Sequence, residues 1–286
     1  MKKADGIFLT GREKIKFAIQ SATTPVLTGK SSTLSLSFSS IVSDGEQMEL
    51  DGGGSTYPNT VFVSFRTNTQ TAVQRDIWNL ALSNDNQNHI LINSSMGMSA
   101  YAISKTDIDA VGQADFDAEN VGKKALVGIP STAALDAGFY PKNYIDNPYN
   151  PFTKGSAIAP VSTNDADNKV YIVGIGPAIG SPAYPPPPTT WMKVRITATP
   201  DGYSVDYAAL TAITHKTVTV TKKQDDVFSY VSFNTNNVVN VEPAGSNWDI
   251  AWSYGIDLTP YKSSVSGISD SIPYLYQDLV YSNIYN

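Results

Sequence analysis

Apolar and polar side chains alternate along much of this chain, which is the pattern of strands that bury one face and expose the other. The pattern predicts strands at residues 33–41, 60–65, 77–82, 89–93, 169–173, 191–198 and 203–207. Short polar connections join several of them, and Asp201-Gly202 between the last two is typical of a hairpin turn. Since strands follow one another through short turns, we predict antiparallel sheets. The predicted fold class is all-β, with the sheets packed as a β-sandwich-like module.

The alternation stops in the middle of the chain. Residues 105–113 predict one or two helical turns, with Thr106 as the N-cap and with Asp107 and Asp109 in the first turn, where carboxylates stabilise a helix. Residues 136–152 are rich in Pro, Asn and Tyr and predict a long ordered loop. Loops of this length inside a domain often carry function.

One sequence pattern occurs twice. Residues 61–68 contain Val-Ser-Phe and are followed by Ile-Trp-Asn-Leu-Ala at residues 77–81, while residues 230–236 contain Val-Ser-Phe and residues 247–251 read Asn-Trp-Asp-Ile-Ala. The copies lie roughly 170 residues apart, which is the length of a domain and exceeds the period of solenoid or propeller repeats. The predicted domains are an N-terminal extension, a complete module and a partial second module, at residues 1–43, 44–213 and 214–286.

The partial second module ends in an aromatic, apolar segment at residues 272–281. An uncovered strand edge of this kind is a template for association. We therefore expect residues 215–286 to pack against the first module and the N-terminal strand near residues 34–41, or against another chain.

Composition narrows the class of protein. The chain of 286 residues has a net charge of −6 and no basic stripe, which argues against a nucleic-acid partner. It has no cysteine, so disulfides, thiolate metal sites and a cysteine nucleophile are excluded. No apolar run is long enough to span a membrane, and the basic start is not followed by the apolar stretch of a signal peptide. We expect a targeting segment to be absent from this chain.

Five residues are candidates for ligand binding. Met96 and Met98 flank a glycine, and two thioethers so placed suit a soft metal or a haem iron. The alternative is that both methionines fill the core. Tyr140, Tyr144 and Tyr149 lie in and beside the predicted loop, and they either line a pocket for a planar ligand or cover the end of the sandwich.

Other motifs carry less chemistry. Residues 164–168 begin like a calcium loop but lack its glycine and its closing glutamate, so we predict a polar turn. The glycine-rich residues 174–180 follow a strand but lead into prolines instead of a helix, which argues against a dinucleotide site. No catalytic triad pattern occurs, so we do not expect an enzyme; a glycan-active enzyme with an unrecognised site is one alternative.

The repeated pattern resembles the HmuY family, which comprises haem-binding or related lipoproteins of the Bacteroidetes outer membrane. The likeness covers residues 45–210 loosely and residues 215–255 more closely, including the Asn-Val run at 236–241. It implies an all-β fold, a lipid anchor on a cysteine that this chain lacks, a cell-surface location and an outer-membrane transport receptor as partner.

The resemblance also implies where haem ligands would lie. The family places His or Met ligands after the tryptophan strand, the second of them just before the closing strands, which corresponds here to residues 152–156. No His or Met occurs from Ser99 to Trp191, so only tyrosines remain as donors on that stretch. We therefore expect a non-enzymatic surface protein with no resident cofactor, which binds a small planar ligand or a surface glycan. The alternative is a structural or adhesive β-sandwich that binds protein or glycan.

Overall fold

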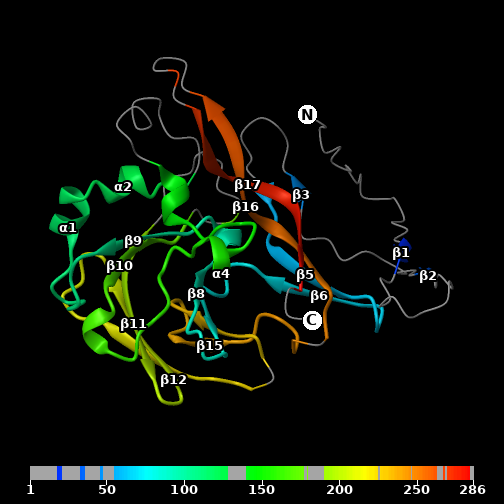
Figure 1. The fold of residues 1–286 in the computed structure, drawn as a ribbon, viewed down its shortest axis with the longest axis horizontal. Helices are drawn as coiled ribbons and strands as arrows, with labels where there is room; N and C mark the ends of the chain where they lie inside the picture. Colours follow the sequence, from blue (N-terminus) through cyan, green and yellow to red (C-terminus); the bar gives the residue numbers. More distant parts are fainter. Residues whose placement is uncertain are drawn as a thin grey trace.

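The protein is built mostly of antiparallel strands in three main sheets (Figure 1), which confirms the predicted all-β class. The computed structural model describes residues 18–20, 33–35, 46–47, 55–127, 140–176, 179, 190–224, 226–245, 247–262, 267 and 269–283.

The five-stranded sheet has the strand order β13-β12-β11-β10-β9. Its strands are β9 (Ser99–Ile103), β10 (Val170–Gly174), β11 (Trp191–Thr199), β12 (Gly202–Ala209) and β13 (Lys216–Thr221). The hairpin of β11 and β12 turns at Asp201, as the Asp-Gly pair predicts.

Two four-stranded sheets complete the main fold. The middle sheet has the order β15-β14-β7-β8, with β7 (Leu80–Ser83), β8 (Ile90–Ile92), β14 (Phe228–Ser232) and β15 (Asn237–Val239). The outer sheet has the order β17-β16-β5-β6, with β5 (Asn59–Ser64), β6 (Thr69–Gln74), β16 (Ile250–Lys262) and β17 (Ser269–Ser282).

The remaining elements are short. Two-stranded ladders join β1 (Ala18–Gln20) to β2 (Thr33–Ser35) and β3 (Glu46–Gln47) to β4 (Ser55–Thr56). The helical turns are η1 (Ser94–Met96), α1 (Gln113–Ala118), α2 (Val121–Lys124), η2 (Pro141–Tyr144), α4 (Pro151–Lys154) and η3 (Asp165–Asp167).

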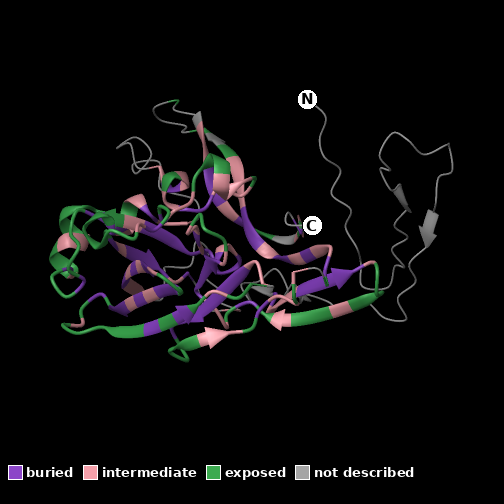
Figure 2. Ribbon diagram, turned by 60° about the horizontal axis from the view of Figure 1, so that its bottom comes forward, coloured by how far each residue is buried: buried purple, intermediate pink, exposed green. Residues whose placement is uncertain are grey.

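The middle sheet is covered on both faces. Leu80 and Leu82 of β7 pack with Val194 of the five-stranded sheet in the largest hydrophobic cluster. Ala81, between them, points the other way and packs with Phe62 of the outer sheet in a second cluster. Every residue of β7 and β14 is therefore buried, as expected for strands enclosed between two layers. Figure 2 shows buried strands, in purple, in the interior of the molecule.

The two copies of the sequence pattern exchange strands. The first copy supplies β5, β6 and β7, and the second supplies β14, β15 and β16. Each copy forms a hairpin from its first two strands, and the hairpin pairs with the third strand of the other copy. The register is matched, because Leu80 pairs with Val231 and Ile250 pairs with Val63.

The side chains of the two copies make matching contacts. The Phe233 amide donates to Asn79 Oδ1 at 2.7 Å, and the Phe65 amide donates to Asp249 Oδ2 at 2.6 Å. The Trp78 ring meets Tyr230 edge-on at 5.0 Å, and the Trp248 ring meets Phe62 edge-on at 5.2 Å. Asn93, which follows β8, donates from Nδ2 to the Trp78 carbonyl at 2.9 Å. Asn283, which follows β17, donates from Nδ2 to the Trp248 carbonyl at the same distance. The repeated residues thus occupy equivalent positions.

The described strands of residues 214–286 share sheets with the strands before them. The predicted boundary between residues 213 and 214 falls between β12 and β13, which are neighbours in one sheet. β17 pairs with β16, and β16 pairs with β5, so the apolar C-terminal segment packs on the first module. Its expected contact with the N-terminal strand near residues 34–41 stays a prediction. In the N-terminal segment, the described strand β2 pairs with β1. That residues 1–43, 44–213 and 214–286 fold as separate units stays a prediction.

The helix predicted at residues 105–113 is wrong in position. Residues 105–112 form bends and turns, and α1 begins at Gln113. The Asp107 carboxylate accepts from the Asp109 amide at 3.0 Å and closes a local turn; Asp side chains compete with helix formation in this way. Asp115 caps α1 instead, through the Gly112 amide at 3.1 Å. Of the predicted strand 33–41 and loop 136–152, residues 36–41 and 136–139 lie outside the described residues.

Candidate functional site

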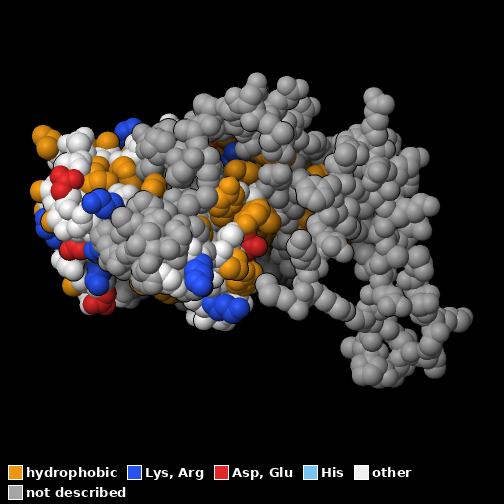
Figure 3. Space-filling view, turned by 90° about the horizontal axis from the view of Figure 1, so that it is seen from above, with side chains coloured by type: hydrophobic (Ala, Val, Ile, Leu, Met, Phe, Trp, Pro, Cys, Tyr) orange, Lys and Arg blue, Asp and Glu red, His pale blue; other side chains and the backbone are white. Residues whose placement is uncertain are grey.

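The structure describes the predicted loop from residue 140 onward, and we call residues 140–158 the tyrosine loop. At its start, Lys142 forms an ion pair with Asp270 on β17. At its end, Ile158 forms a β-bridge with Ile90 of β8. On the face seen from above, hydrophobic side chains, a class that includes Tyr, gather among the described residues (Figure 3).

A buried carboxyl group fastens the tyrosine loop. Asp146 is 8 % exposed, and its two oxygens accept from the Ile92 amide of β8 and from the Ala157 amide, both at 2.8 Å. Burial raises the pKa of Asp146 to about 7, although both amide donors lower it. One side chain therefore ties the two limbs of the loop to each other and to the edge of the middle sheet.

The three predicted tyrosines have different surroundings. Tyr140 is half-buried and precedes η2. Tyr144 packs on Tyr101 of β9, with ring centroids 5.1 Å apart. Tyr149 is 62 % exposed and has Lys154 Nζ 5.4 Å from its ring centroid. No ring contact among the described residues joins these three tyrosines, and that they line one pocket stays a prediction.

The predicted methionine pair lies in the core. Met98 is fully buried and Met96 nearly so, in the cluster between the five-stranded and middle sheets. The Met96 sulfur accepts from Arg75 Nη1 at 3.1 Å. The alternative interpretation, that both methionines fill the core, matches these positions. The candidate residue Tyr144 lies apart from both methionines, against a separate hydrophobic cluster on the other face of the five-stranded sheet.

The sequence did not predict an aromatic contact at residues 152–156, the segment where the resemblance to the family implies a second haem ligand. Phe152 of α4 meets the His89 ring edge-on at 4.9 Å, and it stacks on Phe228 of the middle sheet at 6.2 Å. His89 and Phe152 are 63 positions apart, and no local periodicity predicts such a contact. The segment thus packs against a histidine without supplying a metal donor of its own.

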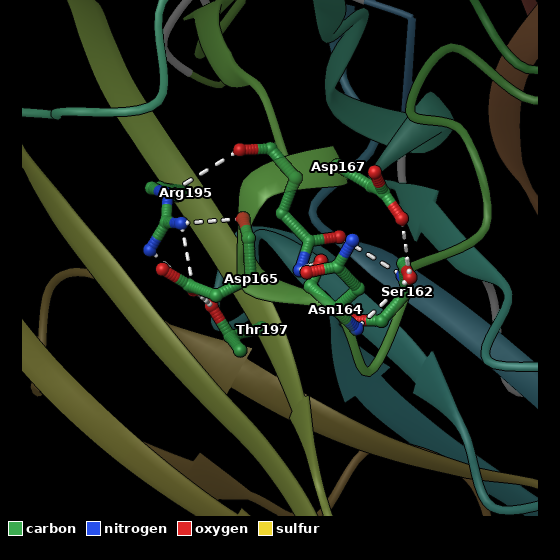
Figure 4. A network of polar contacts seen from close by, with 7 residues as sticks. Ser162, Asn164, Asp165, Asp167, Arg195 and Thr197 are labelled. Carbon is green, nitrogen blue, oxygen red and sulfur yellow. Dashed lines mark hydrogen bonds and ion pairs between the residues drawn. The ribbon is translucent and has the colours of Figure 1, made fainter.

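The calcium-like motif is a polar turn, as predicted. Arg195 pairs with the Asp165 carboxylate at 2.7 Å, and Thr197 donates to it at 3.1 Å (Figure 4). Asp167 accepts from Ser162 at 3.1 Å. Both carboxylates are therefore engaged by the protein, and the described residues contain no group of three or more His, Asp or Glu that could hold a metal ion.

A match to a family model identifies the family. The structure is an antiparallel β protein, and a family model described as HmuY protein matches residues 56–225, more than half of the chain. The chain therefore belongs to the HmuY family, a non-enzymatic family of surface-associated, haem-binding proteins. Comparisons with curated proteins and with solved structures gave no match. Among the described residues, no helix is long and apolar enough to cross a membrane.

Neither the methionine pair nor the two histidines form a pair of accessible axial donors for a haem iron. Such an iron needs accessible His, Met, Cys or Tyr donors. Met96 and Met98 are buried in the core, and the Met96 sulfur is engaged by Arg75. His89 packs on Phe152, while His215 Nδ1 lies 3.0 Å from Asp109, so the two histidines have separate surroundings.

Proposed function

We propose that this chain is a non-enzymatic, surface-displayed ligand-binding protein of the HmuY type, whose ligand is a small planar molecule or a surface glycan held at the tyrosine loop. The match of the family model to residues 56–225 carries the proposal. The fastening of the loop by Asp146 supports it, because a preordered loop loses less entropy when a ligand binds.

The family also suggests a setting. The proposal includes a cell-surface location in the outer membrane through a lipid anchor, and a transport receptor as partner. The net charge of −6 is compatible with an extracellular surface and with a partner that is not nucleic acid.

Titration with haem tests the role of the predicted ligands. We expect no sharp Soret shift of the kind produced by two strong axial ligands, because the thioether donors are buried. A saturable complex that is lost in Met96→Leu or Met98→Leu would contradict this and make the thioethers ligands. Leucine is the appropriate replacement because it nearly conserves volume, so these variants keep the core packed. Tyr149→Ala, at an exposed position, shows whether any residual haem binding depends on the loop.

A further inference from the structure

β16 and β17 extend beyond the outer sheet as a two-stranded ribbon. β5 pairs with β16 only at residues 250–252, whereas β17 pairs with β16 as far as residue 262. In Figure 1 the ribbon, drawn in orange and red, rises away from the sheets. Ile256 and Leu275 share one face of it and pack with Ile145 of the tyrosine loop. The ribbon is therefore held against the loop on one face.

The opposite face carries tyrosine and hydroxyl groups. Asp257 lies across from Tyr274 in the register, and Gly255 lies across from Tyr276. The rings of Tyr274 and Tyr276 are 5.2 Å apart and inclined at 51°. Thr259 Oγ1 and the Tyr276 hydroxyl share a hydrogen bond. By the register these side chains lie on one face of the ribbon. Ile272, opposite Thr259, lies on the same face and is buried, so the face is covered at that point and open toward Tyr276.

Tyr149 joins this face from the loop. Burial, followed by a hydrogen bond from its hydroxyl to Asp257, raises the pKa of Tyr149. The ring nevertheless remains 62 % exposed, and Tyr276 is 36 % exposed. We define the tyrosine face by five residues from three segments, which are Tyr149, Asp257, Thr259, Tyr274 and Tyr276.

We propose that the tyrosine face binds a neutral oligosaccharide. Tyrosine rings present flat apolar surfaces on which the C–H face of a sugar ring can stack, and their hydroxyls supply polar contacts at the edge. The Asp257 carboxylate and the Thr259 hydroxyl supply acceptors and a donor for sugar hydroxyls. The contact between the Tyr274 and Tyr276 rings and the hydrogen bond between Tyr276 and Thr259 order these rings before binding, which reduces the entropic cost of association.

Charge selects among glycans. Asp257 contributes a negative charge at the face, and Lys154 Nζ, 5.4 Å from the Tyr149 ring centroid, contributes a positive one. Charges of both signs leave no single-sign surface for uronic-acid or sulfated polymers, which favours a neutral sugar. The inference rests on the proposed ligand-binding role and assigns it a ligand class and a position.

Isothermal titration calorimetry against neutral oligosaccharides, namely glucan, xylan, mannan and galactan fragments, tests the proposal. The full chain should bind at least one of them, and Tyr149→Ala and Tyr276→Ala should each weaken that binding about ten-fold or more, because each removes an aromatic stacking surface. Tyr149→Phe keeps the ring and removes only its hydroxyl, so it should weaken binding less. Ile213→Ala is the matched control, because Ile213 is an apolar side chain 85 % exposed outside the tyrosine face.

Two outcomes overturn the proposal. One is the absence of binding to every oligosaccharide at millimolar concentration, and the other is binding that Tyr149→Ala and Tyr276→Ala leave unchanged. If size-exclusion chromatography instead shows an oligomer that Tyr276→Ala dissociates, with no oligosaccharide bound, the face is an interface between copies of this chain. If no oligosaccharide binds but haem forms a saturable complex that Tyr149→Ala weakens, only the glycan assignment fails. If neither ligand binds, the proposed ligand-binding function fails as well.

Discussion

At the scale of single residues, the structure separates side chains that look alike in the sequence. Met96 and Tyr149 are both candidate ligand residues, yet the first lies in the core and the second is exposed. The alternation of apolar and polar residues predicts which side chains share a face of a strand. It does not predict whether that face contacts solvent or another sheet. The role of Asp146 has no signal in the sequence, because it depends on amides at residues 92 and 157 that only the fold brings together.

The raised pKa of Asp146 makes stability depend on pH. Its pKa rises from 3.8 to about 7 on folding, so between about pH 4 and 7 the folded state holds a proton that the unfolded state has released. The contribution of this group is therefore fully present below about pH 4 and is lost as the pH rises through 7, by at most about 1.4 kcal/mol per pH unit. Asp146→Asn should remove this slope, as measured by urea unfolding between about pH 5 and 8.

Glu242 is the necessary control for that measurement, because burial also raises its pKa to about 7. Glu242→Gln reports its separate contribution, and the double variant should lose both. If Asp146→Asn leaves the pH dependence of the wild-type chain unchanged, the buried carboxyl does not titrate in this range.

The two repeated tryptophans should differ in their contribution to stability. Trp248 is buried, whereas Trp78 is only half-buried. Trp248→Ala should lower the free energy of unfolding by about 3–5 kcal/mol through lost burial and the resulting cavity. Trp78→Ala should cost less, because part of its ring already contacts solvent. Urea midpoints of both variants, measured at one pH, test this order. Equal losses would show that the half-buried Trp78 ring stabilises the fold as much as the buried Trp248 ring.

At the scale of elements, the sequence predicts strands better than their partners. The Asp-Gly turn joins neighbours in the chain, so the hairpin of β11 and β12 follows from local chemistry. The pairing of β7 with β14 joins residues about 150 positions apart, and no local periodicity encodes it. The repeat indicated equivalent positions, and matched contacts at Asn79 and Asp249 agree with it. The helix predicted at residues 105–113 is wrong for a local reason. The Asp107 carboxylate accepts from the Asp109 amide and forms a turn, although Thr106 was a plausible N-cap.

At the scale of the whole molecule, the family match and the sheets end in different places. The match stops at residue 225, after β13, but the middle sheet takes β14 from beyond it and the outer sheet takes β16 and β17. The largest cluster contains Val231, which is fully buried against strands of the matched region. The core between the sheets therefore draws on both sides of the predicted domain boundary.

A chain that stops at residue 225 should consequently fail to fold as a complete module. Its strands β5 and β7 would lose the partners β16 and β14, and two apolar strand edges would be exposed in their place. We expect a fragment of residues 1–225 to lack a cooperative urea transition and to be cleaved rapidly by protease, whereas the full chain unfolds in a cooperative transition. Addition of a 226–286 fragment should restore protection, because the exchanged strands can pair in trans. In the full chain, Val231→Ala provides a milder test and should shift the entire transition, since Val231 belongs to the shared core. If residues 1–225 instead unfold cooperatively with the stability of the full chain, the predicted division into a complete module and a separate partial module is correct, and the shared sheets contribute little to folding.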